Sequence, residues 1–320
     1  MWPFKKRTVE FQTWPIVRTK PGGKTFGEAV RVFINNWQCH LTTIDVYADG
    51  AIDCWGFVDL ALFRQKLASR WIVPGTKDTG QHLSVFNFGS STAINAEWWQ
   101  SAHSISTKVD EIIHRLNPAH NDLIDKHGDD TEVRGKVRCA KMGLSDKKVY
   151  KKIDQSDELI LGDEVPILRR LDSGYELTPM FVFADGLVRI GPEGDFLDVS
   201  QIQGLHDRGE IQCSAPKGSK IMISGLGKFC CKEDFGFVPI SARIGEIYDK
   251  IEELNGRPSI VRLCAEAYDS YEQDRSRERL EVLRELYERV PDHLRCYCGD
   301  MDTRDSLIIQ ALYGSDAIER

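Results

Sequence analysis

The sequence predicts an α+β protein made by tandem duplication of a small domain, followed by a C-terminal helical segment. Within its 320 residues one pattern occurs twice, with three separated segments matching in the same order and at nearly constant spacing. The matched segments are 27–30 (GEAV) with 162–165 (GDEV), 46–50 (VYADG) with 182–186 (VFADG), and 105–112 (ISTKVDEI) with 240–247 (ISARIGEI). A fixed period over ordered segments is the signature of a duplicated structural unit.

The first copy is expected to run strand, hairpin, helix, strand, helix. Strands are predicted over 29–35 and 41–48, which are rich in β-branched and apolar residues. Asp49-Gly50 provides the positive φ angles of a tight turn, and 51–55 forms the returning strand. Apolar spacing then predicts a helix over 59–69 with Asp59 as its cap, a strand over 82–88, and a closing helix over 105–116 that ends at Asn117-Pro118.

The second copy repeats this order, and a helical segment follows it. We expect strands over 166–171, 177–184 and 187–190, a short helix over 199–207, strands near 211 and over 220–224, and a closing helix over 241–254. Apolar stripes at helical spacing then predict two further helices, the second of which ends at Pro291. The predicted domains are 1–130, a connector 131–156, the second copy 157–256 and the C-terminal segment 257–320. The chain is long enough for two or three compact units, each with its own core.

Charge differs strongly between these segments. The connector has eight basic and three acidic residues, whereas the second copy has ten basic and eighteen acidic ones. The connector is therefore a solvated linker, a polyanion site, or a segment that docks on the acidic second copy. We do not expect a nucleic-acid partner, because the whole chain carries a net charge of −7 and is repelled by a polyanion.

Composition predicts a globular protein of the cytoplasm. No apolar run approaches the roughly 20 residues that span a bilayer, so we expect no membrane partner. The first residues are not followed by the apolar core of a signal peptide. Nine cysteines without regular spacing indicate reduced thiols rather than a disulfide framework.

Two neighbouring tryptophans are the candidate partner-binding residues. All seven tryptophans lie in the first copy, and Trp98 and Trp99 are adjacent. Adjacent side chains point in different directions on a strand or a helix, so both rings are hard to bury on one face. We therefore predict an exposed aromatic pair here, with burial of both rings under the following helix as the alternative.

An aspartate cluster near the C-terminus is the candidate metal site. Asp300, Asp302 and Asp305 offer the oxygen ligands that a hard cation prefers, although the spacing is not that of an EF-hand loop. In the alternative, Asp302 or Thr303 caps the last helix and Asp305 lies in its first turn. Familiar catalytic and nucleotide-binding motifs are missing from the sequence, so we assign no catalytic residue and expect no cofactor.

The residues 44–55 (IDVYADGAIDCW) and 290–302 (VPDHLRCYCGDMD) resemble segments of uncharacterised bacterial proteins grouped as domains of unknown function. That resemblance transfers no site residue. An acidic bacterial chain without catalytic motifs is also similar in character to immunity proteins, which neutralise toxins by occlusion. The sequence thus favours a non-catalytic module that binds another protein, such as a basic toxin. The alternatives are a metal-dependent hydrolase at the aspartate cluster and a structural component of a bacterial defence assembly.

Overall fold

The computed structural model describes residues 9–20, 23–76, 80–121, 123–124, 131–134, 137–140, 148–152, 158–299 and 304–314. The first copy contains β1 (Thr13–Lys20), β2 (Gly23–Asn36), β3 (Gln38–Tyr47), β4 (Ile52–Asp53), β5 (Phe57–Val58), α1 (Leu60–Ala68), β6 (Ile72–Val73), β7 (Gln81–Val85), β8 (Gly89–Trp98) and α2 (Ala102–Leu116). The second contains β11 (Lys148–Lys152), β12 (Leu159–Leu171), β13 (Gly174–Phe183), β14 (Leu187–Ile190), β15 (Phe196–Asp198), α3 (Ser200–Asp207), β16 (Ile211–Gln212), β17 (Lys220–Ile223), β18 (Gly227–Cys231) and α4 (Ile240–Leu254). The hairpin of β9 (Thr131–Arg134) and β10 (Val137–Ala140) lies between the copies in sequence.

The order of elements is the same in both copies, which confirms the predicted α+β tandem duplication. The two Asp-Gly turns join β3 to β4 and β13 to β14, and Gly50 and Gly186 have φ angles of 78° and 84°. Each closing helix ends at an asparagine whose Nδ2 donates to the carbonyl of the alanine before its own turn. The distances are 3.0 Å for Asn117 and 2.8 Å for Asn255. In each copy, an asparagine at the end of the closing helix is therefore hydrogen-bonded to the hairpin.

An ion pair between strand and closing helix is also repeated. Arg115 on α2 contacts Glu28 on β2 at 2.6 Å, and Lys250 on α4 contacts Asp163 on β12 at 2.6 Å. Both members of the second pair lie 135 positions after those of the first. The two pairs use different residue types but have the same charges and the same distance. The two copies therefore share this ion pair as well as the path of the backbone.

The strands of the two copies join into a single closed barrel. The ring runs β13-β17-β18-β8-β7-β3-β2-β1-β11-β12 and returns to β13. The copies meet at two antiparallel seams, β1 with β11 and β8 with β18, where Ile16 pairs with Val149 and Ala93 with Cys231. Equivalent strands thus face each other at both seams. This arrangement leaves no free edge between the copies.

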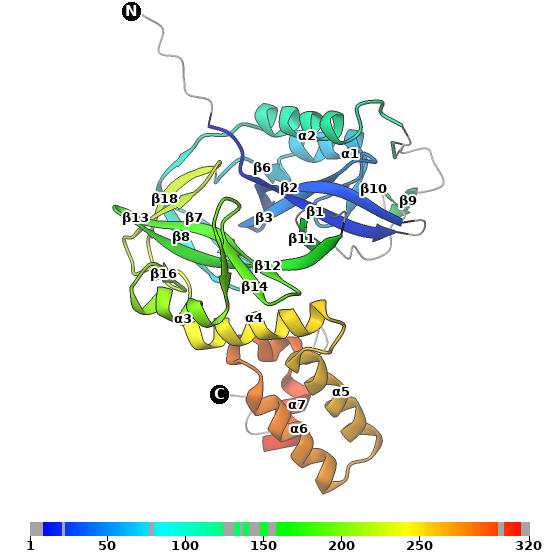
Figure 1. Cartoon of the computed structure of the whole chain (residues 1–320), viewed down its shortest axis with the longest axis vertical. Helices are drawn as coiled ribbons and strands as arrows, with labels where there is room; N and C mark the ends of the chain where they lie inside the picture. The colour runs from blue at the N-terminus through cyan, green and yellow to red at the C-terminus, as the bar shows by residue number, and fades with distance from the viewer. Residues whose placement is uncertain are drawn as a thin grey trace, which may run out of the picture.

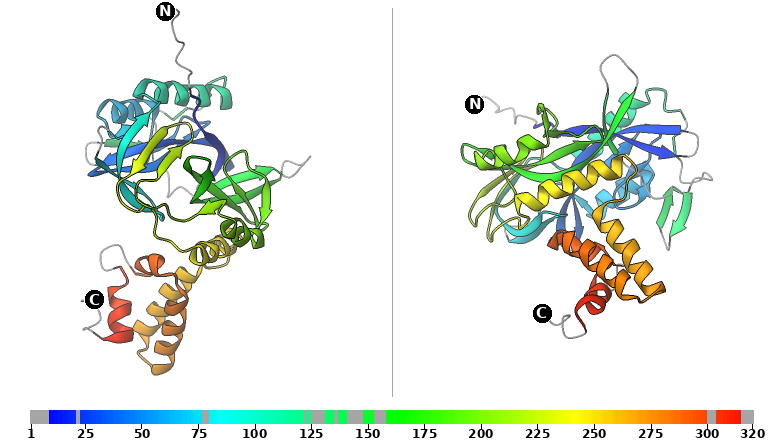
Figure 2. Two further views of the ribbon diagram at one scale, coloured as in Figure 1. Left: turned by 90° about the vertical axis from the view of Figure 1, so that its left-hand side faces the viewer. Right: turned by 60° about the horizontal axis from the view of Figure 1, so that its bottom comes forward.

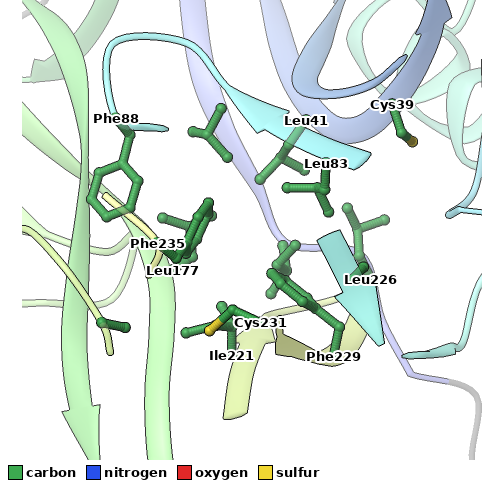
Figure 3. Close-up of a cluster of buried hydrophobic side chains, with 14 of the residues drawn as sticks. Cys39, Leu41, Leu83, Phe88, Leu177, Ile221, Leu226, Phe229, Cys231 and Phe235 are labelled. Carbon is green, nitrogen blue, oxygen red and sulfur yellow. The ribbon is translucent and has the colours of Figure 1, made fainter. Parts of the chain in front are cut away.

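The barrel core is common to both copies, which differs from our expectation of a separate core for each. It combines side chains from β2, β3, β7 and β8 with side chains from β12, β13, β17 and β18, and Figure 3 shows Leu41 and Leu83 of the first copy facing Ile221 and Phe229 of the second. Outside the barrel, α1 and α2 cover the strands of the first copy, and α3 and α4 cover those of the second (Figure 1).

Several barrel strands are missing from the sequence prediction. β8 is rich in small polar residues, so its sequence lacks the apolar alternation that predicts a strand. β18 begins with the last glycine of a glycine-rich turn, so its sequence reads as part of the turn. β11 lies inside the expected connector, where it pairs with β1 and β12. Lys151 of β11 contacts Asp185 at 2.7 Å. The end of the expected connector is therefore a strand that joins the two copies, and its Lys151 pairs with an acidic residue of the second copy. For the rest of the connector the three interpretations stay predictions.

The C-terminal segment is a helical unit beneath α4. It contains α5 (Ile260–Gln273), α6 (Arg277–Arg289), the 3₁₀ helix η1 (Asp292–Tyr297) and α7 (Ser306–Tyr313), which share a hydrophobic cluster of their own. Ser259 and Ser276 cap α5 and α6, since their hydroxyls accept backbone N–H groups of the first turns. Figure 2 shows the unit projecting away from the barrel. Among the described residues, no helix is long and apolar enough to cross a membrane.

Candidate protein interface

Trp98 belongs to the end of the barrel rather than to an exposed pair. Its ring packs edge-to-face on Phe33 of the core, with centroids 4.9 Å apart, and its Nε1 donates to Thr76 Oγ1 at 3.0 Å. A Cβ added to Gly75 would lie only 2.2 Å from this ring, so glycine is required beneath it. The expectation of exposure is wrong for Trp98, because the last residue of β8 turns its side chain toward the core.

Trp99 is half-buried and lies at the junction of β8 and α2. Its backbone N–H donates to Leu226 O at 2.8 Å across the seam between the copies, and its Nε1 donates to Glu97 Oε1 at 3.2 Å. The two neighbouring tryptophans therefore do not form one exposed aromatic surface. Their role in partner binding stays a prediction.

The exposed tryptophans of the first copy are Trp37 and Trp55. Trp37 occupies the turn between β2 and β3 with its side chain fully in solvent, and Trp55 is 49% exposed. The Trp55 ring packs edge-to-face on Trp71, with centroids 6.2 Å apart, and on His40 at 5.1 Å. Lys66 lies over the Trp71 ring at 5.1 Å. We call Trp37, Trp55, Trp71 and His40 the tryptophan surface.

The end of the β2–β3 hairpin positions Trp37, His40 and Trp71, and Trp55 joins them through its contacts with His40 and Trp71. Trp37 sits between the paired residues Asn36 and Gln38, and His40 follows on β3. The N–H of Asn35 donates to Trp71 O at 2.8 Å, which brings the segment after α1 to the same place. Three segments distant in sequence thus present aromatic rings together.

The backbone at the tryptophan surface is strained. Trp37 and Trp55 have φ angles of 62° and 65°, in the left-handed region that bulky residues avoid. Register shows that Trp55 corresponds to Gly191 of the second copy, because Val46 pairs with Ile52 and Val182 with Val188. Gly191 has a φ of 75°, so the second copy places glycine where the backbone demands it. The first copy keeps a tryptophan there at a cost of about 1–3 kcal/mol.

This comparison also shows how the sequence could have revealed Trp55. Shifting the first Asp-Gly segment by 136 positions aligns Trp55 with Gly191. Glycine is the residue that a tight turn of this kind favours. A tryptophan at the same position of the other copy therefore indicates that its aromatic ring has a function.

The aspartate cluster is only partly described. Asp300 and Asp302 lie outside the described residues. Asp305 precedes α7, and its carboxylate accepts a hydrogen bond from Tyr287 Oη at 2.7 Å rather than capping the helix with its side chain. Burial, together with this hydrogen bond, raises the pKa of the Tyr287 hydroxyl. Among the described residues, no group of three potential ligands is arranged to hold a metal ion.

Comparisons with known proteins agree with the duplication. A family model described as a domain of unknown function (DUF7638) matches residues 15–120 and again residues 149–258. A second model, also described as a domain of unknown function (DUF7639), matches residues 259–317. No curated protein and no solved structure matches the chain. The expected resemblance to families of unknown function is confirmed: the chain belongs to the DUF7638 family, with two copies of that domain followed by a DUF7639 segment.

Proposed function

We propose that this chain is a non-catalytic module that binds another protein through the tryptophan surface. The observation that carries the proposal is the exposure of Trp55 in a strained backbone conformation where the second copy has Gly191. Strain that folding does not require points to a role of the side chain in function. Tryptophan is also the residue type most enriched among energetic anchors of protein interfaces.

Charge supports a basic partner. The chain carries a net charge of −7, and a basic protein approaches it faster and in a preferred orientation. A toxin neutralised by occlusion would be such a partner, and this immunity role is the specific form of the proposal. Lys66 beside Trp71 adds positive charge within the surface, so the acidic excess that would attract a basic partner belongs to the second copy.

The test separates loss of binding from loss of folding by using the second copy as a template. Trp55→Gly copies Gly191 and relieves backbone strain of about 1–3 kcal/mol. It also removes two aromatic contacts of about 0.5–1.5 kcal/mol each. We therefore expect a melting temperature within a few degrees of the parent chain. Binding should fall by at least about thirtyfold if the ring is an anchor of ~2 kcal/mol or more.

Affinity capture from the native host, followed by quantification of each captured protein, provides the readout. The partner should be depleted with Trp37→Ala and with Trp55→Gly, and retained with Tyr248→Ala, which removes an aromatic ring that is 53% exposed on α4. Adding salt should slow its association. A captured set that is unchanged by both tryptophan variants would refute the proposal.

A further inference from the structure

A second feature of the molecule is a cavity of about 220 Å³ at the barrel wall between the two copies. It opens beside Thr42 and Thr43, beyond the point where β7 stops pairing with β3. The last residue of β7, Val85, forms one side of the opening. The volume equals about seven waters at ~30 Å³ each, which is too small for a drug-sized ligand and sufficient for a compact metabolite.

A buried arginine lines this cavity. Arg31 lies on the same face of β2 as Phe33 of the barrel core, and only 7% of it is exposed. Burial lowers the pKa of its guanidinium to about 10, against the opposing effect of Glu164 and Glu176, so it stays charged at neutral pH. Its Nη1 donates to Leu177 O at 2.6 Å. A guanidinium carries five N–H donors, so this carbonyl engages one of them.

The fold does not require this arginine. Gly27 pairs with Tyr47 in the first copy as Gly162 pairs with Phe183 in the second. The same register places Pro166 at the position of Arg31. The second copy therefore has an uncharged residue at the equivalent position, and a buried cation that the fold can omit suggests a ligand.

The ring of Trp14 lines the cavity beside the arginine. This side chain is 2% exposed, and its ring lies 5.6 Å from the Arg31 guanidinium. Its Nε1 is buried, so a ligand in the cavity meets the Arg31 guanidinium and not this N–H.

An acidic group lies on another wall of the same cavity. Glu164 of β12 lines it and interacts electrostatically with Arg31. A cavity lined by one positive and one negative side chain favours a ligand that is neutral overall and carries both charges. A simple anion would meet the Glu164 carboxylate, and a simple cation would meet Arg31.

We propose that this cavity binds a free α-amino acid. The ligand carboxylate accepts hydrogen bonds from the Arg31 guanidinium, and its ammonium group faces Glu164. The entrance adjoins a cleft of about 540 Å³ that shares Val85 and Phe86 with the cavity and is bordered by Tyr297 of the C-terminal segment. The ligand would enter through this cleft. The inference is independent of the tryptophan surface.

Thermal unfolding of the full chain with each proteinogenic L-amino acid tests the proposal, and isothermal titration calorimetry quantifies any hit. We expect at least one amino acid to raise the melting temperature saturably. Its methyl ester, which lacks the carboxylate, and its N-acetyl form, which lacks the ammonium, should give no shift.

Variants connect the binding to the cavity. Arg31→Gln should weaken binding by about tenfold or more, because it removes a charged hydrogen-bond donor. Glu164→Gln keeps the shape of the side chain and should weaken binding by about tenfold, because it removes the charge that faces the ligand ammonium. Trp99→Phe is the control, since Trp99 does not line the cavity. If Arg31→Gln fails to fold, Glu164→Gln alone decides.

Three results would overturn the proposal. They are the absence of any amino-acid shift, equal binding of the N-acetyl form, and a shift that persists in Glu164→Gln and in folded Arg31→Gln.

Discussion

A buried ion pair on α4 gives a quantitative prediction because the duplication supplies its own control. Arg243 and Glu246 are 0% and 3% exposed and contact each other one helical turn apart. Arg243 also donates to Asn87 O at 2.7 Å, and Asn87 Nδ2 donates to Glu246 at 3.3 Å. The pair therefore holds the turn between β7 and β8 of the first copy against the closing helix of the second.

Glu246→Leu leaves the Arg243 charge buried without its carboxylate. Removing one partner of such a pair costs about 3–5 kcal/mol, a large part of the 5–15 kcal/mol that stabilises a typical domain. Removing both charges in Arg243→Met with Glu246→Leu should cost less than Glu246→Leu alone, since no charge is then stranded.

The first copy carries the equivalent pair in solvent. Lys108 and Glu111 of α2 lie 135 positions earlier, 3.4 Å apart, with exposed fractions of 25% and 59%. Glu111→Leu should therefore change stability by no more than about 1 kcal/mol. Urea unfolding followed by circular dichroism gives both values. Equal effects of Glu111→Leu and Glu246→Leu would show that burial does not decide the strength of this pair.

Four further predictions follow from individual contacts. Burial raises the pKa of Asp163, but its ion pair with Lys250 outweighs that effect and holds the pKa below the usual range. Asp163→Asn should thus lower stability by about 0.5–1 kcal/mol at pH 7, and in acid titrations the difference should shrink as the pH falls below about 4, where the carboxylate becomes protonated. Trp98→Ala should lower the free energy of unfolding by about 2–4 kcal/mol in urea, because it leaves a void at the barrel end; a loss below 1 kcal/mol would contradict the packing. Asp305→Asn should destabilise the C-terminal segment by about 1–2 kcal/mol in thermal unfolding, and a metal-dependent rise in melting temperature that this variant abolished would instead favour the hydrolase alternative. Burial raises the pKa of Cys39 to about 12, so iodoacetamide should modify this thiol only after unfolding, as mass spectrometry of native and denatured protein would show.

The sequence by itself determined the duplication, the fold class and the order of most elements. Matched segments such as 46–50 and 182–186 contain their own turn chemistry, because Asp-Gly specifies a hairpin wherever it follows a strand of this kind. The closing helices were equally readable, since their apolar residues recur at helical spacing and asparagine ends both of them. Turns and helices of this kind depend on interactions between residues that are close in sequence, so the order of residues is sufficient to predict them.

Only the tertiary structure decided how the two copies combine and which side chains reach the surface. The seams β1–β11 and β8–β18 are pairings between strands more than a hundred residues apart, and no local propensity encodes them. Closing the barrel merges two potential cores, turns Trp98 inward and leaves Trp37 and Trp55 outside. It also brings Arg31 of one copy and Glu164 of the other to the same cavity. The burial of a side chain and its pairing with a distant charge depend on contacts between residues far apart in sequence. The spacing of residues along the chain therefore does not predict them.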